Sequence, residues 1–257
     1  MMDNNNDYDT FVRNPPNPVP ISDSSIDESL FSSGSLSSLF SISFNISSFN
    51  VNGLKMQGPL KIEQISTFFS MKQITFGGIV DTHLSPKQMK FLSKCLPNYT
   101  VFSSDLDLTR NTRSTGGVSL LIHNSLSSHV QDFTSHSSRI LSVDLYFKGN
   151  VKLRIFVIYI PPTSDSVLRS DTINLLIKLL IQSRQAGFYH AICGDFNMHL
   201  DKFYPIYFNQ PQVASKSTHQ LFNHLLTHGY AEFTPTNHSD TLGTFRHDNQ
   251  ITRIDYV

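Results

Sequence analysis

The sequence has little cysteine, no tryptophan and no excess of charge of either sign. Its 257 residues include only two cysteines, Cys95 and Cys193, which are too few for a disulfide framework or a four-thiolate zinc site. No run of 18 apolar residues occurs, and the N-terminus lacks the basic and apolar segments of a signal peptide. We therefore expect an intracellular protein that is neither secreted nor held in a membrane. A nuclear location is compatible with this, although no motif indicates it.

The net charge of zero hides an uneven distribution. Residues 1–40 hold six acidic side chains and one basic, whereas residues 41–257 hold 19 basic and 14 acidic. The first segment is rich in Asn, Pro and Ser and has little to bury, so we expect a disordered acidic tail there. We place one folded domain at 41–257. Its mild basic surplus is compatible with a polyanionic partner but does not identify one.

Segments with strand and helix patterns alternate along this domain, which is typical of a layered α/β or α+β fold. The expected strands are residues 44–50, 74–81, 118–122, 140–147, 153–160 and 191–193. The expected helices are residues 60–69, 85–96, 172–184 and 220–227. Ser85 and Pro86 supply a helix N-cap and a first-turn proline. Residues 148–150, Lys-Gly-Asn, predict a hairpin turn between two of the strands.

Polar side chains follow the ends of several expected strands, where a rigid sheet can hold them with their tips toward solvent. Five such segments occur in order, at residues 48–54, 79–84, 157–162, 192–197 and 252–257. In the fourth, Asp195 and Asn197 are two residues apart, so an extended chain would project both side chains to one side. Such a pair can orient a water and hold a phosphate oxygen. The alternative for the same two residues is an Asx turn after a strand.

Taken together, the five segments resemble the endonuclease/exonuclease/phosphatase superfamily. The resemblance is closest to the apurinic-type endonuclease domain of non-LTR (LINE-like) retrotransposons. It covers about residues 40–257, and its most specific parts are Gly194-Asp195-Phe196-Asn197 and Arg253-Ile254-Asp255-Tyr256. It implies a four-layer sandwich in which two packed mixed β-sheets are flanked by helices.

The resemblance also implies a phosphate site and a metal site. Asn50 would bind the scissile phosphate, and Asn52 and Asp81 would lie at a divalent cation, Mg²⁺ or Mn²⁺. A hard cation held by few carboxylates keeps open positions for phosphate and water. DNA is then the expected partner, with a small-molecule phosphoester as the less favoured substrate.

Four further residues take catalytic roles by the same resemblance. Tyr159 would hydrogen-bond the phosphate, and Asp195 would orient or deprotonate the attacking water. Asn197 would steady that water and the transition state, and Asp255 lies where the family has an aspartate that orients a catalytic histidine. Fixed donors of this kind stabilise the charge that builds on the phosphorane oxygens.

The sequence departs from the family in three places. Asp81 stands where the family usually has Glu, which draws the carboxylate back by about one methylene. Asn52 is uncharged where many relatives have Asp. The family also continues into another strand and a Ser-Asp-His segment, so we expect a fold that is incomplete at its C-terminal edge and lacks the catalytic histidine.

The implied function is metal-dependent hydrolysis of DNA phosphodiesters by an activated water, of the retrotransposon type. One alternative is a non-catalytic transposon remnant, since the loss of strands exposes a sheet edge. Another is a phosphatase of a small phosphoester on the same fold. Separately, His224 and His228 are four apart on an expected helix, which suits either a zinc site or a solvated helix surface.

Overall fold

The computed structural model describes residues 44–107, 116–198, 216–231, 245–247, 250–252 and 255–256. They belong to one compact unit, Phe44–Val257. The expected disordered tail at 1–40 lies outside the described residues and stays a prediction. Among the helices within the described ranges, none combines the length and apolar character that a membrane span requires.

The first sheet contains four strands in the order β1-β2-β4-β3. They are β1 (Ile46–Asn50), β2 (Phe76–Val80), β3 (Tyr99–Ser103) and β4 (Val118–His123). β1 runs parallel to β2, and the other two pairings are antiparallel. Because β1 and β2 are parallel, their carboxyl ends meet at one edge, where Asn50 is paired with Val80.

The second sheet contains five strands in the order β11-β8-β7-β6-β5. They are β5 (Val130–Ser137), β6 (Ile140–Phe147), β7 (Val151–Tyr159), β8 (Tyr189–Asp195) and β11 (Asp255–Tyr256). β7 and β8 are parallel and end together, with Tyr159 paired with Asp195, while the remaining pairings are antiparallel. A separate two-stranded sheet is formed by β9 (Phe245–His247) and β10 (Gln250–Thr252).

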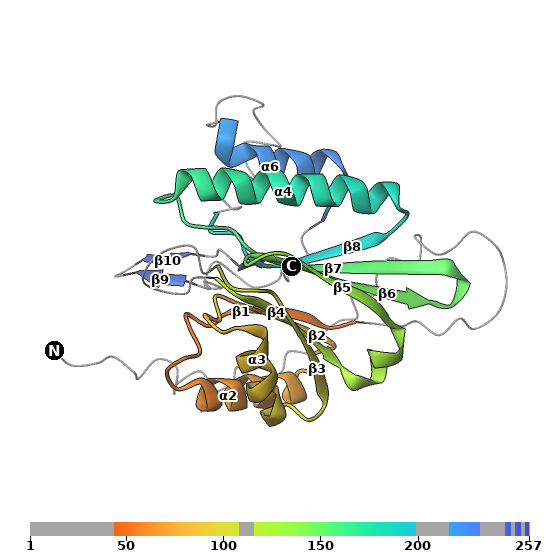
Figure 1. Ribbon diagram of the computed structural model, residues 1–257. Helices are drawn as coiled ribbons and strands as arrows, with labels where there is room; N and C mark the ends of the chain where they lie inside the picture. Colours follow the sequence, from red (N-terminus) through yellow and green to blue (C-terminus); the bar gives the residue numbers. More distant parts are fainter. Residues whose placement is uncertain are drawn as a thin grey trace. The chain divides into compact units, whose positions relative to one another are not determined.

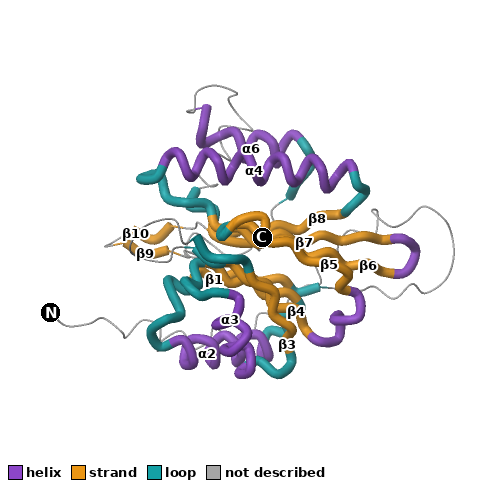
Figure 2. The backbone as a smooth tube through the Cα atoms, in the orientation of Figure 1, coloured by secondary structure: helices purple, strands orange, loops and turns teal. Residues whose placement is uncertain are grey.

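Helices cover the outer face of each sheet, as Figures 1 and 2 show. They are α2 (Gly58–Met71), α3 (Pro86–Leu92), α4 (Ser166–Gln185) and α6 (Lys216–Thr227). α2 and α3 lie against the first sheet, and α4 and α6 lie against the second (Figure 1). Three short 3₁₀ helices lie in the connections, namely η2 (Ser93–Cys95), η3 (Asn124–His129) and η4 (Lys148–Asn150).

In the part of the chain that the structure describes, the hydrophobic core forms three buried clusters, one between each pair of layers. Phe69 of α2 packs with Ile79 beneath the first sheet. Leu120 and Val157 belong to the cluster between the two sheets. Leu176 of α4 belongs to the cluster on the second sheet's outer face. The expected four-layer sandwich of two mixed sheets flanked by helices is thus confirmed.

Two glycines in β2 let the layers approach closely. A Cβ atom at Gly77 would lie 2.1 Å from the ring of Phe69 in α2. A Cβ atom at Gly78, on the other face, would lie 2.9 Å from the sulfur of Cys193 in the second sheet. The two glycines therefore let β2 lie close to the second sheet shortly before Asp81, the polar residue that follows the strand.

The expected elements agree with the structure except at their ends. The strand Ile140–Phe147 and the hairpin at 148–150 are confirmed. Ser85 caps α3 through a capping box with Gln88, as its position predicted, but α3 ends at Leu92 and η2 continues the segment. α4 begins at Ser166 rather than residue 172, because Asp165 caps it by accepting from Leu168 N.

Candidate active site

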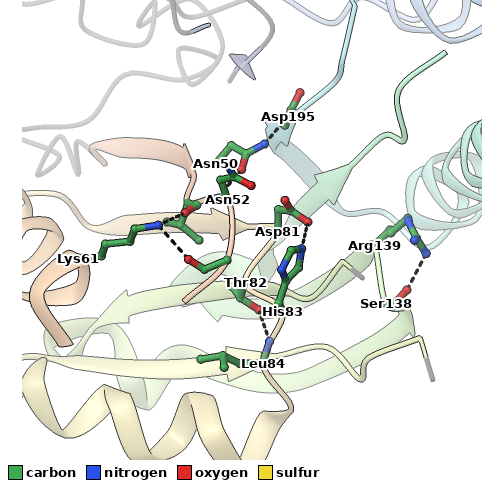
Figure 3. A network of polar contacts seen from close by, with 12 residues as sticks. Asn50, Asn52, Lys61, Asp81, Thr82, His83, Leu84, Ser138, Arg139 and Asp195 are labelled. Atoms are coloured by element: carbon green, nitrogen blue, oxygen red, sulfur yellow. Dashed lines mark hydrogen bonds and ion pairs between the residues drawn. The ribbon is translucent and has the colours of Figure 1, made fainter. Parts of the chain in front are cut away.

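The candidate active site lies where β1, β2, β7 and β8 end. Asn50 closes β1 and Asp195 closes β8, in different sheets. Asn50 Nδ2 donates to Asp195 Oδ2 over 2.7 Å, which joins the two sheets through side chains 145 residues apart in sequence (Figure 3). The structure thus brings the first and fourth polar segments together, as the family resemblance implied.

Asp195 is buried, with 1% of its surface exposed. Both carboxylate oxygens accept hydrogen bonds, Oδ2 from Asn50 Nδ2 and Oδ1 from Asn197 N at 2.8 Å. The second bond is an Asx turn, and Asn197 has a φ of 46°. The expectation of an extended chain through Asn197 is therefore wrong, because β8 ends at Asp195 and the chain turns. The turn still leaves the carboxylate facing Asn50.

Burial raises the pKa of Asp195 from its ordinary value near 3.8 to about 6. Two hydrogen bonds, from Asn50 and from the backbone of Asn197, act in the opposite direction because they favour the charged form. The negative charge of Asp81 raises the pKa further, and the positive charge of Arg169 lowers it. The result is a carboxylate that is mostly ionised at neutral pH and ready to accept a proton.

Arg169, in the first turns of α4, fixes the loops that follow β7 and β8. It is 6% exposed, and its guanidinium donates to Pro161 O and, over 3.1 Å, to Asn197 O. Asn197 Nδ2 donates to Ile160 O over 2.9 Å, which ties the same two loops together again. The side-chain amide of Asn197 is therefore held by its neighbours.

Gly194 is required by the backbone just before Asp195. Its φ is 147°, and a Cβ atom there would lie 1.9 Å from Ile158 O in the neighbouring strand β7. The group that approaches the backbone so closely is the carbonyl of the adjacent strand, with which Gly194 is paired.

Tyr159 ends β7 beside Asp195 and is half-buried. Burial is the main reason that the pKa of Tyr159 lies well above its usual value of 10, and the negative charges of Asp81 and Asp195 act in the same direction. Arg139 opposes them. The phenol therefore stays protonated and can donate a hydrogen bond.

Asp81 begins the loop after β2, with a φ of 58°. Its Oδ1 lies 2.9 Å from Nε2 of His83 (Figure 3). The loop is fastened to the glycines before β4, because Thr82 N donates to Gly117 O over 3.0 Å and His83 N donates to Gly116 O over 2.9 Å. Gly116 and Gly117 therefore hold the loop that carries Asp81, the expected metal ligand.

Asn52 lies in the loop after β1, with a φ of 45°. Its backbone N donates to Asn50 Oδ1 over 2.9 Å, which orients the amide of Asn50 toward Asp195. Lys61 of α2 donates to Val51 O over 2.8 Å and to Gly53 O over 3.0 Å. The loop is therefore anchored to α2 on the side away from the second sheet.

The donor chemistry of this edge fits a hard divalent cation. Within the described residues no group of three His, Cys, Asp or Glu side chains forms a site that could hold a metal by protein ligands alone. Mg²⁺ commonly binds through one or two carboxylates, with waters and substrate phosphates completing its shell. Asp81 offers a carboxylate and Asn52 an amide oxygen at the same edge (Figure 3). These two residues are the ones that could hold it.

Asp255 lies in β11, directly opposite Asp195 in the antiparallel pairing with β8. Its backbone is therefore at the site, as the order of the polar segments predicted. Its expected role in orienting a histidine stays a prediction.

The histidine pair at the end of α6, with His224 in the helix and His228 in the turn after it, lies apart from this edge. The rings of His224 and His228 stack with their centroids 4.1 Å apart, and His228 Nδ1 lies 2.7 Å from His224 O. Among the residues with described side chains, no third metal-binding group joins them. The structure gives the zinc alternative no support.

Four contributors to the site carried no clear signal in the sequence. Arg169 lies outside the helix expected at residues 172–184, and Lys61 is one polar residue of the helix expected at residues 60–69. His83 follows Asp81 but indicates no partner, and Gly53 lies within a polar loop. Their contacts run to backbone carbonyls or to side chains of other loops, so only the fold reveals them.

Neither a protein-family model nor a curated protein sequence matches the chain. Its fold is nevertheless similar to solved structures. An AP endonuclease from Archaeoglobus fulgidus has a TM-score of 0.53 and 13% identity, over 83% of this chain and 85% of that chain. This similarity shows that the chain shares the fold of that endonuclease, in which two mixed sheets are flanked by helices.

Two further structures illustrate the range of proteins with this likeness. The 3′ phosphatase NExo from Neisseria, solved with a product DNA hairpin, has a TM-score of 0.49 and 13% identity, over 72% of this chain and 71% of that chain. TDP2 from Caenorhabditis elegans has a TM-score of 0.47 and 11% identity, over 62% of this chain. The chain spans 48% of that TDP2 chain.

Proposed function

We propose that this chain is a divalent-metal-dependent phosphodiesterase that hydrolyses DNA, of the type encoded by non-LTR retrotransposons. One observation carries the proposal. Asp195, a buried carboxylate with a raised pKa, accepts a hydrogen bond from Asn50 across the two sheets, at the strand ends where Asp81 and Tyr159 also lie. The fold likeness to an AP endonuclease supports the same reaction class.

In this proposal Asp195 is the general base. A pKa of about 6 leaves it ionised at pH 7 yet basic enough to take a proton from water, which is the balance that general-base catalysis needs. The water oxygen forms a bond to phosphorus as Asp195 takes its proton, and the bond from phosphorus to the leaving oxygen breaks. Asn197, held by Ile160 and Arg169, fixes the water's position.

Neutral donors would bind the phosphate. Tyr159 stays protonated, so its hydroxyl can donate to a non-bridging oxygen, and the amide of Asn50 is oriented in advance by the backbone of Asn52. Donors fixed before the reaction stabilise developing negative charge without reorganising. A bound cation, held by Asp81 and Asn52, would supply Lewis-acid neutralisation of the phosphate.

DNA is the proposed substrate, and an intracellular location with access to DNA is part of the proposal. The retrotransposon type rests on the ordered motifs from Asn50 to Asp255. It predicts nicking of intact duplex DNA rather than cleavage only at abasic sites or removal of terminal phosphates.

A nicking assay tests the proposal. We expect the wild type to convert supercoiled plasmid to open circles with Mg²⁺ and to lose this activity with EDTA. Asp195→Ala should be slower by about 10²–10⁴-fold, the usual range for loss of a general base. The matched control is Asp171→Asn, on the exposed face of α4. Equal nicking by the wild type and Asp195→Ala would reject the assignment.

Assays on the same purified protein also test the two alternative functions. Release of phosphate from inositol phosphates without nicking of DNA would indicate the small-phosphoester phosphatase. No activity on either substrate, together with a broad and uncooperative thermal transition by circular dichroism, would indicate a non-catalytic remnant.

A further inference from the structure

We propose that His83 is a positioning residue that orients the Asp81 carboxylate for a divalent cation. This inference rests on the proposed function, because it concerns the same metal site. It adds a residue to that site for which the sequence motifs indicate no role.

The contact itself is direct. His83 Nε2 lies 2.9 Å from Asp81 Oδ1, and the two side chains are 31% and 13% exposed. Since a carboxylate can only accept, the imidazole donates from Nε2. One oxygen of Asp81 is thereby committed to His83, and the carboxylate loses the freedom to rotate away.

The main chain of His83 is held in place by the surrounding backbone. His83 N donates to Gly116 O over 2.9 Å, and His83 adopts a φ of 56°. The residue before it, Thr82, is buried and donates its N to Gly117 O over 3.0 Å. These main-chain bonds to the residues just before β4 fix the point from which the imidazole extends toward Asp81.

Gly53 makes room for the ring. A Cβ atom built at Gly53 would lie 3.0 Å from His83 Nδ1 and 3.7 Å from Cε1. The loop after β1, which carries Asn50 and Asn52, thus packs directly on the imidazole. His83 links the loop that bears Asp81 to the loop that bears Asn52, the two residues that could hold the cation.

Two roles of His83 predict opposite changes in metal affinity when its imidazole is removed. If His83 merely occupied the carboxylate and competed with the cation, removing the imidazole would strengthen metal binding. If His83 positions the carboxylate, removing it weakens binding, as loss of a hydrogen bond to a metal ligand commonly does by 10–100-fold, roughly.

Mn²⁺ affinity, measured on the full chain by electron paramagnetic resonance of free Mn²⁺, distinguishes these signs without relying on activity. We expect His83→Leu to weaken Mn²⁺ binding by about 10-fold or more. His83→Gln, whose amide can still donate to Asp81, should recover part of the loss. The matched control is His123→Leu, a half-buried histidine at the other end of β4 whose ring contacts Ser125.

A double-mutant cycle with Gly53→Ala tests whether the contact between Gly53 and the imidazole of His83 contributes to Mn²⁺ binding. The added methyl should displace the imidazole and weaken Mn²⁺ binding in the wild-type background. In the His83→Leu background it should add little, while its backbone strain at a φ of 80° stays the same in both. Thermal midpoints measured alongside identify any variant that fails to fold.

The outcomes separate the two proposals. If wild-type protein binds no Mn²⁺ at millimolar concentration, the metal-dependent function is overturned, and this inference with it. If the wild type binds Mn²⁺ and His83→Leu binds it equally or more tightly, only the positioning role is overturned.

Discussion

The two carboxylates of the site are held in contrasting ways. Asp195 is 1% exposed and accepts hydrogen bonds from Asn50 and from the backbone of Asn197. The buried guanidinium of Arg169 also acts on its charge. The side chain of Asp81 is 13% exposed; Asp81 lies in a loop, has a left-handed backbone conformation and contacts one histidine. Asp195 is the last residue of a strand, whereas Asp81 is the first residue of a loop whose next residue, Thr82, is itself buried.

This difference suits different chemistry. Burial raises the proton affinity of Asp195, which a general base needs and a metal ligand does not. Partial exposure leaves Asp81 accessible to a hydrated cation, which keeps several of its waters when it binds. Substitutions at the loop of Asp195 should therefore affect stability strongly, and those at the loop of Asp81 should affect mainly ligand binding.

The largest effect is expected at Gly194. Gly194→Ala would place a methyl group 1.9 Å from the carbonyl of Ile158, so the β7–β8 pairing must distort. We expect a loss of more than about 4 kcal/mol in the free energy of unfolding, measured by urea denaturation. Gly149→Ala is the control, because its φ is 78° but nothing lies within 4 Å, and it should cost only about 1 kcal/mol. Similar losses at both positions would contradict the steric account.

Arg169→Met should have the next largest effect. Two buried carbonyls, of Pro161 and Asn197, would lose their donor, at a cost of about 2–4 kcal/mol. Because Arg169 lowers the pKa of Asp195, its loss should also move the acidic limb of the kcat/KM profile to higher pH. Arg184→Met, near the exposed end of the same helix, should change stability by only about 0.5 kcal/mol. An unshifted acidic limb would remove Arg169 from the electrostatics of Asp195.

Asp195→Asn should remove the activity and flatten the dependence of stability on pH. The pKa of Asp195 rises from near 3.8 to about 6 on folding, so the wild type loses stability, by at most about 3 kcal/mol, as the pH rises through that range. The asparagine variant has no such loss, although it offers one acceptor fewer to the donors Asn50 Nδ2 and Asn197 N. Thermal midpoints at pH 3 and pH 7 measure this, because the carboxyl is neutral in the folded and the unfolded chain well below pH 3.8. A wild-type midpoint that does not fall relative to that of the variant between pH 3 and pH 7 would refute it.

Asp81→Asn should have the smallest effect on stability. Its contact with His83 is partly exposed, and such pairs contribute about 0–1 kcal/mol. Mn²⁺ affinity should nevertheless fall by at least about 10-fold, because the site loses its only proposed carboxylate ligand. A large loss of stability with unchanged Mn²⁺ affinity would reverse the contrast between the two carboxylates.

Hydrophobic periodicity predicted most of the strands and helices, whereas the four layers were implied by the family resemblance. β6 and the capped start of α3 were located correctly from local patterns. β5 was missed because its middle residues, Gln131 to Thr134, are exposed and show no apolar face, as is common in a strand at a sheet edge. β3 was also missed; it has a clearer pattern of Tyr, Val and Phe but is only five residues long.

The site was predictable in position but not in its internal contacts. Polar residues after parallel strands must meet at a sheet edge, so the placing of Asn50 near Asp195 follows from fold and motif order together. The Asx turn was an open alternative because spacing cannot tell a turn from an extended chain. The contacts of Arg169 with carbonyls 8 and 28 residues away depend on how α4 crosses the sheet, which no local pattern encodes.

The hydrogen bond from Asn50 to Asp195 makes the geometry of the site depend on how the two sheets are aligned. Each sheet can keep its own backbone pairing while sliding against the other, yet this bond of 2.7 Å tolerates little displacement. The side-chain amide protons of Asn50 should therefore exchange slowly with solvent in the intact domain. In a variant such as Gly78→Ala, whose methyl would meet the sulfur of Cys193 between the sheets, they should exchange faster even while both sheets persist.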